Sequence, residues 1–182
     1  GSFASEGTYL RIGIDSYAHY GDGGIGYGFQ YPHGYEHAAV AWWGEGFTFG
    51  YLADGGELVA TSYESGPFGG LNFVSESIIK DDTDEAIYEV ILRTADNRAE
   101  LVHNFHFPKA TKFVILNVTI RNVSPDVLSE VRYRRVWDFD MDNSVDSGDG
   151  FDVDISRNML YAWETHYAAL AASSATPASE WD

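Results

Sequence analysis

The sequence contains no cysteine. This absence excludes a disulfide framework, a zinc site built on thiolates and a cysteine nucleophile. Lysine is scarce as well, because only Lys80, Lys109 and Lys112 occur. Basic side chains number 11 against 28 acidic ones, a formal net charge of −17. Such a field repels nucleic-acid phosphates and anionic lipid head groups, so we expect no nucleic-acid partner.

Long apolar runs are also missing. No stretch approaches the roughly 20 apolar residues of a membrane-spanning helix, so we expect no membrane insertion. The opening residues GSFASEG lack a basic and an apolar segment, and we expect that a signal peptide is absent or already removed. The acidic, lysine-poor composition with 15% aromatic residues and 19 glycines favours an extracellular or cell-surface location. Two glycosylation sequons, at Asn117 and Asn122, agree with that location.

Familiar catalytic signatures are absent too. The chain has no Gly-x-Ser-x-Gly, no His-Glu-x-x-His and no phosphate-binding loop. Glycoside hydrolysis needs two carboxylates across a cleft, and the sequence does not fix the separation of the available glutamates, Glu36, Glu45, Glu57, Glu64 and Glu76. We therefore expect no enzyme, and a glycoside-active hydrolase stays the alternative.

Short alternating segments dominate the chain. Leu10, Ile12 and Ile14 alternate with polar residues or glycine, which is the period of a half-buried strand. Similar segments recur between turn sequences such as Asp81–Glu85 and Pro108–Ala110, and only 161–172 has a trace of helical period. This pattern predicts an all-β fold: an antiparallel two-sheet β-sandwich of about ten strands.

The last ten residues differ in composition from the rest. We expect a single β-sandwich domain over residues 1–172, followed by a Ser/Ala-rich tail or docking arm over 173–182. This tail, or the segment from Phe3 to Ile14, is a candidate to add a strand to a neighbouring subunit, the alternative being that the tail docks on its own domain.

The densest group of acidic residues lies between 138 and 149. Calcium prefers oxygen ligands, and an EF-hand loop supplies them from positions 1, 3, 5, 7, 9 and 12. Counted from residue 138, these positions hold Asp138, Asp140, Asp142, the Ser144 carbonyl, Asp146 and Asp149. The run resembles an EF-hand or dockerin loop, which implies calcium as a cofactor, although the segment before it reads as a strand. Alternatively, the first three aspartates form the outward face of a strand and are neutralised by Arg132 and Arg134.

The run Arg134-Arg135-Val136-Trp137-Asp138-Phe139-Asp140 resembles a strand motif of uncharacterised secreted modules in bacterial and archaeal surface proteins. The resemblance implies an extracellular β-sandwich module and no particular activity. We therefore expect a structural, cohesive protein: a cell-surface or filament subunit that associates with identical subunits and is stiffened by calcium.

Aromatic residues suggest a second function. Tyr31, Tyr35, Trp42 and Trp43 could stack on sugar rings, and one of the two adjacent tryptophans must face outward in a regular strand. The alternative expectation is therefore a carbohydrate-binding module of a secreted polysaccharide-active protein. A loop of the same domain could equally cover the outward tryptophan.

Overall fold

The computed structural model of the protein describes residues 2–21, 26–38, 45–62, 69–137, 139, 141 and 150–172. These residues form thirteen strands, and every pairing between them is antiparallel. The strands are β1 (Ser2–Glu6), β2 (Arg11–Asp15), β3 (Phe29–Gln30), β4 (Gly46–Ala53), β5 (Gly56–Thr61), β6 (Leu71–Asp81), β7 (Glu85–Thr94), β8 (Ala99–Pro108), β9 (Ile115–Asn122), β10 (Ser129–Val136), β11 (Gly150–Asp154), β12 (Met159–Trp163) and β13 (Tyr167–Ala171). The predicted all-β, antiparallel class is confirmed.

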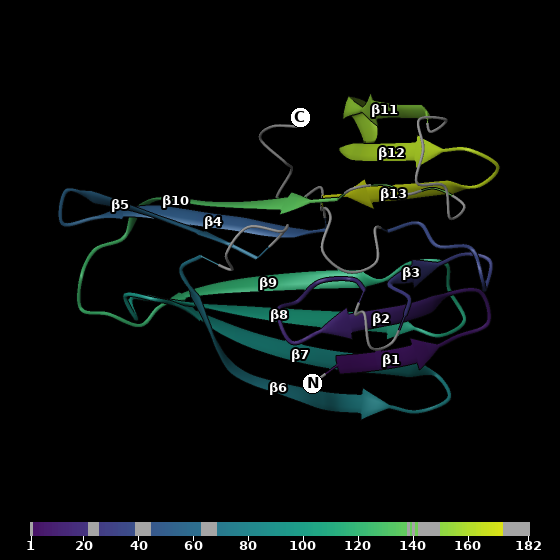
Figure 1. Cartoon of the computed structure of the whole chain (residues 1–182), viewed down its shortest axis with the longest axis horizontal. Helices are drawn as coiled ribbons and strands as arrows, with labels where there is room; N and C mark the ends of the chain where they lie inside the picture. Colours follow the sequence, from purple (N-terminus) through teal and green to yellow (C-terminus); the bar gives the residue numbers. More distant parts are fainter. Residues whose placement is uncertain are drawn as a thin grey trace.

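A four-stranded sheet, ordered β6-β7-β8-β9, is the largest sheet (Figure 1). Its strands follow one another in the chain, since short turns of the predicted kind join them. Along β7 the buried side chains alternate strictly with half-buried ones, as the period of two requires. One face therefore carries the apolar side chains, including Tyr88, Leu92, Leu101 and Phe105.

Two three-stranded sheets cover this apolar face. In the N-terminal sheet, ordered β1-β2-β3, the Phe3 ring stacks on Tyr88 at 4.8 Å. In the middle sheet, ordered β10-β4-β5, the Phe47 ring lies 4.5 Å from His103. One continuous hydrophobic core joins the three sheets. The architecture is sandwich-like, with one layer split into two sheets.

The C-terminal sheet, ordered β11-β12-β13, has a small core of its own around Met141, Ala162 and Ala168. It lies at the upper right of Figure 1, next to the end of β10. The 3₁₀ turn Ile155–Arg157 joins β11 to β12, with the Asp154 side chain accepting from the Arg157 backbone N–H.

Three expectations about the elements need correction. The described residues form thirteen strands in four sheets, rather than about ten strands in two sheets. Residues 161–172, whose sequence has a trace of helical period, lie mostly in strands β12 and β13. The segment Phe3–Ile14 is not free to add a strand to a neighbour, because β1 pairs with β2 within the chain and Phe3 is buried.

No helix among the described residues is long and apolar enough to cross a membrane.

Candidate functional site

Four loops meet at one end of the molecule, the right-hand end in Figure 1. They bring together Tyr9 from the β1–β2 loop, Tyr31 and Tyr35 from the segment after β3, Lys112 from the β8–β9 loop and His166 from the β12–β13 loop. We call these five residues the tyrosine cluster. All four segments connect strands, so their side chains lie at the rim of the sheets.

The lysine lies between two rings of the tyrosine cluster. Lys112 Nζ is 5.2 Å from the Tyr9 ring centroid and 4.6 Å from that of Tyr31, and it donates a hydrogen bond to the Tyr31 hydroxyl. Lys80 and Lys109 pair with carboxylates instead. Among the described residues, Lys112 has no carboxylate partner within ion-pair distance.

The histidine joins the two tyrosines after β3. The His166 ring lies 5.3 Å from Tyr35 and 6.1 Å from Tyr31, and the rings are inclined to each other. The backbone of Tyr31 is fixed by a hydrogen bond between its carbonyl group and Nε2 of His37. His37 is fully buried. The cluster thus presents ring edges and faces at fixed angles.

The backbone beneath Tyr31 and Tyr35 is fixed by one buried carboxylate. Glu36 accepts hydrogen bonds from the backbone N–H groups of Gly28 (2.9 Å), Phe29 (2.6 Å) and Ala38 (3.2 Å). The carboxylate thus adds hydrogen-bond partners for the backbone N–H groups of this segment. Glu36 therefore supports the site structurally.

Of the predicted sugar-binding residues, the structure brings Tyr31 and Tyr35 together, while Trp42 and Trp43 lie outside the described residues. The rest of the cluster, Tyr9, Lys112 and His166, was not predicted. These residues come from three distant loops, and no spacing in the sequence links them.

The predicted calcium ligands Asp138, Asp140, Asp142, Ser144, Asp146 and Asp149 all lie outside the described residues. Of the two arginines considered as their neutralising neighbours, Arg132 pairs with Glu130 at 3.3 Å. Within the described part of the chain, no group of three or more His, Asp or Glu side chains is placed to hold a metal ion. The sequon residues Asn117 and Asn122 are both exposed on β9.

A buried polar centre was also missed by sequence reasoning. Glu45 and Arg135 form an ion pair with side chains only 1% and 8% exposed, and Arg135 Nη2 donates to the Ala18 carbonyl at 2.9 Å. Burial raises the pKa of Glu45, an effect that the neighbouring Arg135 charge opposes. The second arginine of the Arg-Arg-Val motif thus anchors β10 in the core.

His103 and Tyr133 border this centre. His103 Nε2 lies 3.2 Å from the Tyr133 hydroxyl, and burial, with the Arg135 charge adding to it, holds the His103 pKa well below its usual value. A neutral imidazole enclosed in this way serves packing rather than exchange with solvent.

The glutamates considered for hydrolysis have separate partners. Glu45 pairs with Arg135, Glu36 binds backbone amides and Glu76 accepts from the Tyr88 hydroxyl at 2.9 Å. Glu57 is exposed on β5, and Glu64 lies outside the described residues.

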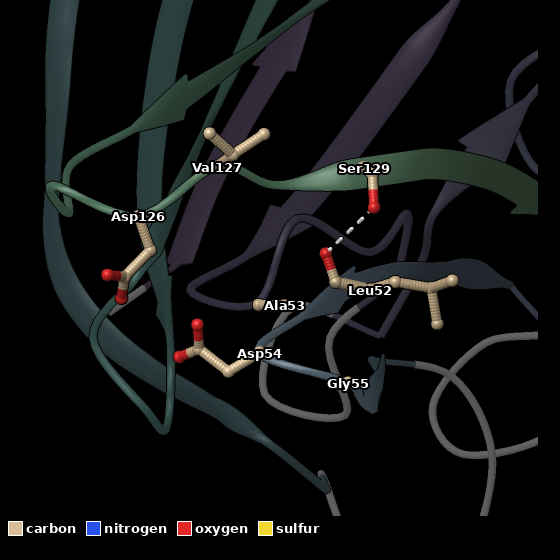
Figure 2. Close-up of a pocket in the computed structure, with 7 residues that line it drawn as sticks. All are labelled: Leu52, Ala53, Asp54, Gly55, Asp126, Val127 and Ser129. Atoms are coloured by element: carbon tan, nitrogen blue, oxygen red, sulfur yellow. Dashed lines mark hydrogen bonds between the residues drawn. The ribbon is translucent and has the colours of Figure 1, made fainter.

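A shallow, open hollow lies between the β4–β5 turn and the β9–β10 loop (Figure 2). Its walls include Asp54 and Asp126, and Ser129 Oγ donates to the Leu52 carbonyl at 3.3 Å. Arg98 neutralises both aspartates, at 2.6 and 3.3 Å. The hollow is therefore explained by an ion-pair network that ties two turns together.

The edge strand β6 is unusually apolar. Four of its large apolar side chains are exposed: Phe73 (44%), Val74 (40%), Ile78 (59%) and Ile79 (57%). Natural sheets shield such edges with charge, proline or bulges, and β6 has two register irregularities and the exposed charges of Lys80 and Asp81. At the opposite edge, Ile115 of β9 and the preceding Phe113 are exposed as well.

Comparison of the chain with protein-family models, with curated proteins and with solved structures finds no match.

Proposed function

We propose that this chain is a structural, cohesive protein of the cell exterior, a surface or filament subunit that associates with identical copies by strand addition. The observation that carries this proposal is the β6 edge, 11 residues long with four exposed large apolar side chains. Unpaired backbone groups beside apolar side chains are a template for another strand. A neighbouring copy at this edge would cover both.

The polarity of the four-stranded sheet selects the partner strand. Neighbouring strands alternate in direction, so β6 and β9, at opposite edges, run in opposite directions. A second copy shifted along the sheet therefore brings its β9 antiparallel to β6 of the first copy. Such a head-to-tail contact leaves a free edge at each end and builds open filaments rather than closed dimers. The four-stranded sheets of successive copies would then form one continuous sheet, which is one layer of the filament.

A charge on the β6 edge tests the proposal. Ile78→Lys should shift the protein from concentration-dependent assemblies to monomer in light scattering, because a second strand would have to bury the ammonium group. Ile155→Lys is the matched control: Ile155 is 83% exposed but lies in the C-terminal part, away from both edges. If wild type and Ile78→Lys both stay monomeric at every concentration, the proposal fails.

The tail 173–182, which lies outside the described residues, is the other candidate for the added strand. Its sequence contains Pro177 and little apolar area besides Trp181. We therefore favour β9. If deleting 173–182 abolishes assembly while an apolar-to-lysine change at Ile115 does not, the tail rather than β9 is the added strand.

We further propose that calcium bound between 138 and 149 stiffens the subunit. The support is the alternating set of oxygen ligands in the sequence. Calorimetry should show calcium binding that Asp140→Ala weakens, because one carboxylate ligand is lost. A melting temperature that responds to neither calcium nor a chelator would contradict calcium binding, and the segment would be merely acidic.

A further inference from the structure

The tyrosine cluster has features that packing does not require. Tyr9 and Tyr35 are 43% and 45% exposed, whereas Tyr20, Tyr51 and Tyr88 are buried and fill the core. Exposed aromatic rings gathered from separate loops mark contact surfaces for ligands or partners. Four loops converge to place the rings of the tyrosine cluster at one end of the molecule, which favours a binding role for them.

The chemistry of the cluster matches a saccharide. Sugar rings offer C–H faces that lie against aromatic rings, and hydroxyl groups that both donate and accept hydrogen bonds. The cluster supplies the ring faces of Tyr9 and Tyr35, while the Tyr31 hydroxyl and Lys112 Nζ supply polar groups already oriented by their mutual hydrogen bond. A ligand would therefore meet side chains that need little ordering, which lowers the cost of binding.

Charge restricts the kind of saccharide. The chain carries a net charge of −17, which disfavours a polyanionic glycan. The positive charge of Lys112 is already shared with the faces of two tyrosine rings. A neutral ligand fits both observations, since it requires no free charge at the site.

We propose that the tyrosine cluster is a binding site for a neutral saccharide, with sugar rings stacked on Tyr35 and Tyr9 and hydroxyl groups bonded to Lys112 and the Tyr31 hydroxyl. The site goes beyond self-association. It lies on the loops at one end of the strands, whereas assembly uses the sheet edges. A surface filament would carry one such site per subunit.

The test uses the whole chain and four neutral polysaccharides, cellulose, chitin, xylan and mannan, in pull-down assays, followed by calorimetry with the matching oligosaccharide. We expect binding to at least one of them, with an affinity that changes little between low and molar salt. Tyr35→Ala should weaken binding about tenfold, the size of effect that one stacked ring produces. Lys112→Met keeps the length of the side chain and should weaken binding less.

Phe151→Ala is the matched control, because Phe151 is a 76% exposed aromatic residue on β11, outside the cluster. This variant should bind like wild type. Circular dichroism of each variant separates lost binding from lost folding, and Tyr9→Ala gives a second variant at the site. No binding to any of the four polysaccharides, equal effects of Tyr35→Ala and Phe151→Ala, or a preference for alginate would overturn the proposal. Because Ile78→Lys tests assembly separately, either proposal can fail alone.

Discussion

The buried ion pair between Arg135 and Glu45 attaches β10 to the core. Arg135 neutralises Glu45 where neither side chain reaches water. Removing one partner of a buried pair leaves the other charge uncompensated, which typically costs about 3–5 kcal/mol. Arg135→Met should lower the free energy of unfolding by about that amount in urea titrations.

The control for that variant is Arg132→Met in the same strand. Arg132 is exposed, and its ion pair with Glu130 is exposed as well, so its loss should cost less than about 0.5 kcal/mol. If the two variants lose equal stability, the buried pair does not hold β10 in the way described.

His103 gives the pH dependence its sign. Its pKa is depressed in the folded chain, so the unfolded state takes up a proton first as the pH falls. The stability that comes from keeping His103 neutral is therefore present above the unfolded pKa of roughly 6.5 and is lost below it. Between pH 7.5 and 5.5 the free energy of unfolding should fall for wild type and fall less for His103→Gln. Parallel curves for the two proteins would contradict this role of His103.

At the scale of elements, the β1–β2 turn is pressed against the β8–β9 turn. A Cβ at Gly7 would lie 2.3 Å from the Lys109 carbonyl oxygen, and the Thr8 N–H donates to that same oxygen at 2.7 Å. Gly7→Ala must therefore push the two turns apart, at a cost of roughly 1–3 kcal/mol. We expect a lower thermal midpoint, and an unchanged midpoint would show that the turns are not in contact.

The sequence predicted the elements that follow one another closely. Turn sequences such as Asp81–Glu85 and Pro108–Ala110 bound these strands, and in β7 buried side chains alternate strictly with half-buried ones. The pairing of β1 with β2 was not predicted, because the packing of β1 depends on distant parts of the chain, as in the stacking of Phe3 on Tyr88. Residues 151–171 were predicted less well, since the turn before β12 uses Asn158 at a positive φ of 52° rather than glycine or proline.

The candidate site could be predicted only in part for a similar reason. Tyr31 and Tyr35 are close in sequence and were predicted, with Trp42 and Trp43, to stack on sugar rings. Lys112 and His166 reach them through the turns of other sheets, and a pattern in one sequence does not encode such contacts. Likewise, Arg134 and Arg135 belong to one sequence motif, although successive residues of a strand point to opposite faces.

At the scale of the whole molecule, charge and edge chemistry act in opposite directions. A net charge of −17 keeps copies apart at low ionic strength, whereas apolar edges at β6 and β9 draw them together. The Debye length is about 8 Å at physiological ionic strength and shortens as salt is added. Added salt therefore weakens the repulsion between copies, while the short-range apolar contacts at the sheet edges persist. Assembly along the sheet should therefore be promoted by salt.

The central claim is that copies join β9 to β6 in one continuing sheet, and the repeat of the assembly tests it most directly. Four strands at roughly 4.8 Å spacing give an axial rise of about 19 Å per subunit when the strands lie across the filament axis. Electron microscopy of the wild-type protein at high concentration and high salt should yield filaments with that rise. Closed dimers, or single particles at every concentration, would contradict it.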